Sequence, residues 1–137
     1  MKYKVALAIL SLSCSVSSNA ETSHACNNET ISSSALELKQ QDRRLVITPK
    51  PQDEPVGKLF SLEIQICDDD SVVTKVKAVM PAHGHGMNYR PKVNQLAEKS
   101  YQVEGLLFHM PGVWLLTIET KSQGTRTKFQ SELLIKP

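Results

Sequence analysis

The stretch "SYQVEGLLFHMPGVWLLTIET", residues 100–120, contains two runs of alternating apolar and polar residues on either side of a Pro-Gly pair. Such period-two alternation is typical of β-strands with one buried face. In the first run the apolar phase slips at Gly105, and a β-bulge at this glycine would explain the slip. We expect the inward rows to be Tyr101, Val103, Leu106 and Phe108 in the first strand and Trp114, Leu116 and Ile118 in the second.

The Pro-Gly pair separates the two runs. In Met110-Pro111-Gly112-Val113 the proline and the glycine occupy the central positions of a type II turn. We therefore predict that the two strands form a hairpin, with His109 and Met110 at its end.

Similar short runs occur along the rest of the chain. In one of them Leu62, Ile64 and Ile66 alternate with polar residues, and no stretch has a convincing helical period. The predicted strands cover residues 35–39, 44–49, 57–67, 72–80, 100–110, 113–120 and 127–136. Seven short strands separated by turn residues predict an all-β domain over residues 35–137, an immunoglobulin-like antiparallel β-sandwich.

Residues 80–99 are the exception to this pattern. They form about twenty residues with no clear strand, which is unusual inside a compact domain and often functional. We expect a long loop here that carries the functional site.

The first twenty residues indicate export. Lysines at positions 2 and 4 precede an apolar run, and small residues end the segment at Ala20, as in a cleaved secretory signal peptide. The apolar run is too short for a membrane-spanning helix. We expect a periplasmic protein that begins at Glu21 with an irregular arm over residues 21–34; a lipoprotein acylated at Cys14 is the alternative.

Charge and cysteine content narrow the function classes. Without Lys2 and Lys4, the sixteen basic residues become fourteen against fourteen acidic ones. No basic stripe remains in the sequence and aromatic residues are few, so nucleic-acid binding has little support. Two cysteines remain in the exported chain, Cys26 and Cys67. In an oxidising compartment they are expected to form a disulfide, and metal binding by these thiols is the alternative.

Histidine and methionine are concentrated in two short stretches. "MPAHGHGMNY" (residues 80–89) and the 109–110 pair hold all of these residues in the exported chain except His24. Thioether sulfur and neutral imidazole together suit monovalent copper. The candidate ligands are His83, His85, Met87, Met80, His109 and Met110.

The local pattern leaves alternatives for some of these ligands. In an extended chain His83, His85 and Met87 would point to the same side, because alternate residues share a face. Gly84 and Gly86 would instead allow tight turns if the ligands wrap around an ion. Met80 and Met110 could instead fill the core, and His109 could be a structural histidine.

The motif "MPAHGHGM", followed by "YQVEGLLFHMPGVWLLTIE", resembles the YtkA-like and FixH-like group of small exported bacterial β-sandwich proteins. The resemblance covers residues 59–137 and implies a sandwich fold and a copper-related role. Two departures are His83, where methionine is common, and the lack of a membrane helix of the FixH kind in the exported chain. The matching positions are Met80, Pro81, His83, His85, Tyr101, Gly105, Phe108, Met110, Gly112 and Trp114.

Three classes of function follow from these patterns. The leading hypothesis is a non-catalytic periplasmic module that binds or handles copper and works with a periplasmic or membrane-bound copper protein. The second is a structural or protein-interaction domain without a metal, whose loop contacts a partner. An enzyme is the least favoured class, because the sequence has no nucleophile with a nearby base and no paired carboxylates near the loop.

Overall fold

The structure is a computed structural model that describes Cys26 and residues 34–50, 56–67 and 70–137. The predicted signal peptide, Cys14 and most of the predicted arm lie outside the described residues. No helix in the described part is long and apolar enough to cross a membrane.

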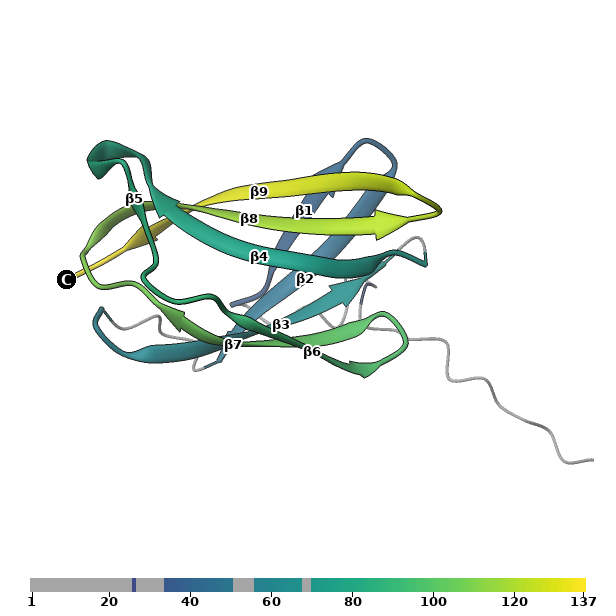
Figure 1. The fold of residues 1–137 in the computed structure, drawn as a ribbon, viewed down its shortest axis with the longest axis horizontal. Coiled ribbons are helices and arrows are strands. Elements are labelled where there is room, and N and C mark those ends of the chain that lie inside the picture. Colours follow the sequence, from purple (N-terminus) through teal and green to yellow (C-terminus); the bar gives the residue numbers. More distant parts are fainter. Residues whose placement is uncertain (1–25, 27–33, 51–55, 68–69) are drawn as a thin grey trace, which may run out of the picture.

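Two antiparallel sheets pack face to face, which confirms the predicted all-β sandwich (Figure 1). The five-stranded sheet has the order β1-β2-β3-β7-β6, and the four-stranded sheet has the order β5-β4-β8-β9. The strands are β1 (Leu36–Gln40), β2 (Arg43–Lys50), β3 (Leu59–Ile66), β4 (Val72–Met80), β5 (His85–Gly86), β6 (Lys92–Ala97), β7 (Ser100–Leu107), β8 (Gly112–Ser122) and β9 (Thr125–Ile135).

The segment 80–99 contains more regular secondary structure than predicted. It contains β5 and β6 as well as a short 3-10 helix, η2 (Pro81–His83). These strands are hard to recognise from sequence because β5 has only two residues and β6 is a mostly exposed edge strand paired only with β7. The prediction of a strandless loop is therefore wrong, although the seven expected strands are present.

The core is formed by the inward rows of both sheets. Every inward residue predicted in β7 and β8 is buried, as are Leu62, Ile64 and Ile66 in β3. The predicted bulge is also present: Phe60 pairs with Leu106 and Ser61 with Glu104, so Gly105 is skipped. Its φ of +81° is a conformation that glycine adopts without steric cost.

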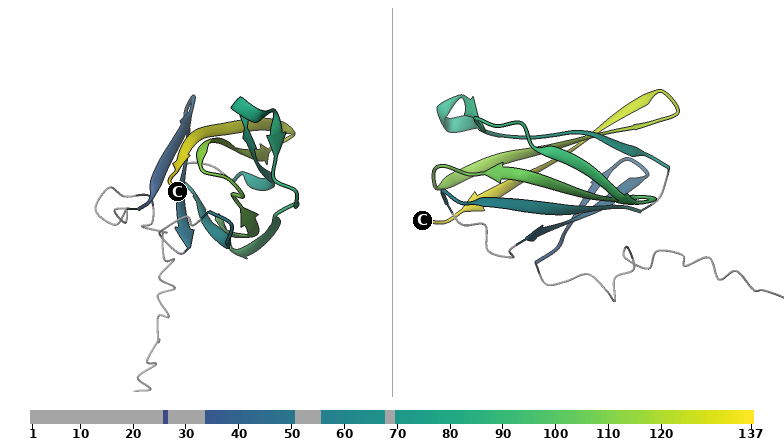
Figure 2. Two further views of the ribbon diagram at one scale, coloured as in Figure 1. Left: turned by 90° about the vertical axis from the view of Figure 1, so that its left-hand side faces the viewer. Right: turned by 60° about the horizontal axis from the view of Figure 1, so that its bottom comes forward.

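β7 and β8 do not form the predicted hairpin. β7 pairs with β3 and β6 in one sheet, whereas β8 pairs with β4 and β9 in the other. The Pro-Gly segment therefore carries the chain from one sheet to the other at one end of the sandwich (Figures 1 and 2). The error arises because two strands joined by a tight turn have the same sequence pattern whether they pair with each other or belong to different sheets.

The opposite end of the sandwich is held by a covalent link, and we call it the disulfide end. Cys67, which follows β3, forms the predicted disulfide with Cys26, with a Cα–Cα distance of 5.6 Å. Beside it the Ile66 amide donates to the Lys99 carbonyl oxygen, and the Lys99 ammonium lies 3.2 Å from Asp70. Nearby, Tyr101 is a buried residue of β7, and burial raises the pKa of its hydroxyl.

Candidate metal centre

The end of the sandwich that carries η2 and the β7–β8 connection is called the histidine end. β4 finishes at Met80, η2 follows, and Gly84 reverses the chain with a φ of +65°. β5 then pairs back on β4, with His85 opposite Met80 and Gly86 opposite Val79. The segment 80–86 is therefore a tight hairpin with a helical turn at its tip, so of the two conformations expected from the sequence the tight turn at Gly84 is the one present.

Three histidine rings form a row at the histidine end. The ring centroids of His83 and His85 are 5.7 Å apart, and the rings are nearly parallel, at 22°. The ring of His85 lies 5.1 Å from that of His109 on the β7–β8 connection. His83 and His85 are exposed and His109 is half-buried, so the row faces solvent.

The spacing of the rings is compatible with a shared ion. A ring centroid lies about 3.2 Å from a metal that the ring binds through nitrogen at about 2.0 Å, so two rings that share an ion are at most about 6.4 Å apart. Both neighbouring pairs satisfy this limit. Within the described residues, however, no group of three His, Cys, Asp or Glu side chains is placed to hold an ion.

Met80 and Met110 lie on the core side of the histidine row. Met80 belongs to the core, with only 2% of its surface exposed, and it shares a face of the sheet with its strand partner His85. Met110 is half-buried, packs against the core and directly follows His109. Met80 is thus a packing residue in this structure, while its position beside His85 keeps it within the candidate ligand set.

Met87 is separated from the histidine row. Its backbone amide donates to the Ala78 carbonyl oxygen, and its side chain packs against the core and lines a groove beside β4. None of the three histidines is among the residues that line this groove. The rings of His83 and His85 contact each other, as expected for residues on one side of the chain.

Trp114 supports the row, a role that the sequence did not reveal. Its side chain is completely buried, and its ring meets that of His109 edge to face at a centroid distance of 5.2 Å. The indole Nε1 donates to the Met110 carbonyl oxygen at 3.0 Å. Trp114 thereby fixes both the backbone of Met110 and the ring of His109.

Close packing joins the two segments of the histidine end. A Cβ on Gly112, whose φ is +130°, would lie only 2.9 Å from Cε of Met80. The β7–β8 connection therefore rests directly on the end of β4. This contact keeps His109 next to the hairpin that carries His83 and His85.

No known protein family, curated protein or solved structure matches the chain. The resemblance to the YtkA-like and FixH-like group therefore rests on the two motifs alone and stays a prediction.

Proposed function

We propose that the protein is a small non-catalytic module that binds one monovalent copper ion at the histidine end. The observation that carries this proposal is the row of His83, His85 and His109 rings. Imidazoles gathered at a solvent-facing rim do not fill the core, and the two methionines behind them supply soft donors.

The donor chemistry favours copper over the other common ions. Zinc sites are built mainly from cysteine, histidine and carboxylate, whereas calcium and magnesium take oxygen ligands. The only cysteines outside the signal segment are joined in a disulfide. In the proposed site His85 and His109 are the central ligands, His83 lies within reach, and Met80 or Met110 supplies the thioether.

The position of the site favours handling of copper over permanent storage. Both exposed histidines lie in a hairpin at the rim of the sandwich, where another protein could reach a bound ion. The proposed compartment is the periplasm, reached through cleavage after Ala20. A disulfide is typical of exported proteins and supports this part of the proposal.

Competition with a chromophoric monovalent-copper chelator tests the metal site. The exported protein should take up one copper, and H85A/H109A should weaken the affinity about a hundredfold or more, a change of about 2.7 kcal/mol. Affinity should also fall on acidification, because protons compete for the ring nitrogens. The thermal midpoint of the metal-free variant should stay close to that of the parent, since His85 is exposed and His109 is half-buried.

The variant H24A serves as the control, because His24 is the one histidine outside the two motifs. It should bind copper like the parent. If H85A/H109A keeps the parent affinity, the site lies elsewhere and the metal-free interaction domain becomes the better hypothesis.

A further inference from the structure

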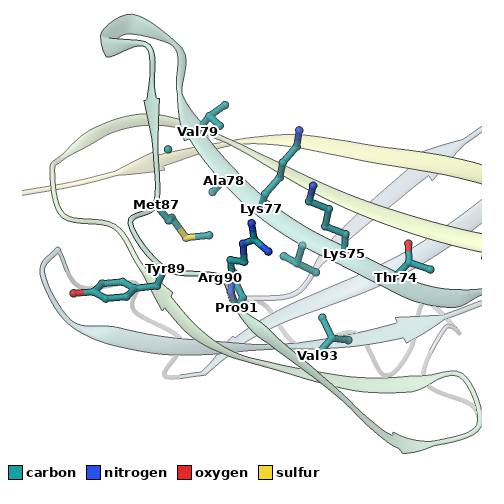
Figure 3. Close-up of a pocket in the computed structure, with 12 residues that line it drawn as sticks. Thr74, Lys75, Lys77, Ala78, Val79, Met87, Tyr89, Arg90, Pro91 and Val93 are labelled. Atoms are coloured by element: carbon teal, nitrogen blue, oxygen red, sulfur yellow. The ribbon is translucent and has the colours of Figure 1, made fainter.

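A groove of about 540 Å³ runs beside β4 (Figure 3). One wall is β4, and the other is the segment 86–93 that leads from β5 into β6. This groove is separate from the row of histidine rings, although β5 takes part in both.

The wall formed by β4 has a free backbone edge. β8 pairs with one side of β4 along its length, but β5 covers the other side only at Val79 and Met80. On this second side the Ala78 carbonyl oxygen accepts from Met87. Since backbone groups alternate in direction along a strand, Val76 presents its N–H and C=O to the same side, where no described strand pairs with it.

The groove is strongly basic. Lys75, Lys77 and Arg90 line it, and no Asp or Glu is among the lining residues. In Figure 3 the side chains of Lys75 and Lys77 extend from β4 away from the segment 86–93, and that of Arg90 extends toward β4. Among the described ion pairs none involves these three residues. Glu119, the residue of β8 opposite Lys75 in the strand register, does not line the groove.

Apolar side chains complete the groove. Met87 and Val93 are partly buried against the core, and Tyr89 is 58% exposed. In an extended chain, alternate side chains point in opposite directions. One set of a bound strand could therefore reach the three cations while the other set contacts the apolar wall.

We infer that this groove binds an extended acidic segment of a partner protein, which adds as a strand to the free edge of β4. Main-chain hydrogen bonds to Val76 would supply part of the affinity, and the three cations would select acidic side chains. The inference does not depend on a metal. The docking surface lies next to the proposed copper site, and the one candidate ligand that it includes is Met87.

Binding of a fluorescein-labelled octapeptide of alternating glutamate and valine to the exported, metal-free protein tests this inference. We expect saturable binding that weakens as salt rises. Amide NMR shift changes should be confined to β4 and residues 86–93. A lysine–valine peptide of the same length should bind at least tenfold more weakly, because it carries the opposite charge.

Charge reversal identifies the residues involved. K75E/K77E/R90E should weaken binding of the acidic peptide about tenfold or more, whereas R126E/K128E/K136E makes the same change in net charge away from the groove and should preserve most of the affinity. The alternative role for lysines on a free strand edge is to prevent aggregation, without any ligand. Equal binding by both triple variants, or shift changes outside the groove, would overturn the inference.

Discussion

The two ends of the sandwich are held together by different means. At the disulfide end a covalent bond, an ion pair and a backbone hydrogen bond connect residues around Cys67 and Lys99. At the histidine end the described contacts include backbone hydrogen bonds such as Gly84 to Met80, but no covalent link; the hairpin and the β7–β8 connection are joined by side-chain packing around Met80 and Trp114. A disulfide joins two segments without close packing around it. At a closely packed end, the packing itself fixes the positions of the side chains.

This difference predicts that changes at the two ends have different functional consequences. Stability should depend on both ends. Arrangement of the histidine row should depend only on the packed end, which is where the proposed ligands project.

Trp114→Ala should have the largest effect. Removal of a fully buried indole should lower the free energy of unfolding by about 5 kcal/mol, because it leaves a cavity and takes away the donor to Met110. Copper affinity should fall as well, since His109 loses its edge-to-face support. Urea unfolding and copper competition measure the two effects.

Trp114→Phe tests the same contact if the alanine variant does not fold. It keeps most of the bulk and lacks the N–H donor, so it should cost less stability than alanine. Unchanged copper affinity in a folded Trp114 variant would contradict the view that packing at this end orders the histidine row.

The double change C26S/C67S should be nearly as destabilising, at about 4 kcal/mol by the chain-entropy estimate for a loop of this length. The sequence separation that the disulfide closes is 41 residues. Copper affinity should stay at the parent level in the folded fraction, because the link is at the opposite end. A parallel loss of affinity would show that the two ends are coupled.

Gly112→Ala should lower the free energy of unfolding by about 2 kcal/mol. This smaller effect tests one packing contact within the histidine end. The new Cβ would meet Met80, and the φ of +130° is unfavourable for alanine. Gly84→Ala is the matched control: its φ is +65° but nothing lies within 4 Å of the new Cβ, so about 1 kcal/mol is expected. Equal losses in thermal unfolding would mean that the Met80 contact carries no energy.

The alternating pattern of apolar residues predicted the sandwich, its inward rows and the Gly105 bulge, because burial of one strand face is a local property of the sequence. The pairing of β7 and β8 was predicted wrongly, since choice of strand partner depends on the whole chain. β6 was missed because an exposed edge strand carries little apolar signal.

The candidate site was predictable in part. The sequence grouped His83 with His85, and their rings do come together, although across a hairpin that was not predicted. The contact of His109 with His85 could not be read from spacing, because it depends on how the β7–β8 connection crosses between sheets. Met87, which the sequence had grouped with the histidines, lies instead in the groove beside β4.

The bulge at Gly105 also determines which side chain lies at the surface of the histidine end. In a strand of strict period two, inward positions 101 and 103 would be followed by 105, 107 and 109, and His109 would point into the core. The extra residue reverses this parity, so that Phe108 is buried and His109 is left at the edge. Deletion of Gly105 would remove the bulge and leave Phe108 inside and His109 outside. If the bulge were lost while the residue stayed, the two would exchange, and a surface imidazole would become an interior one with no ligand changed in the sequence.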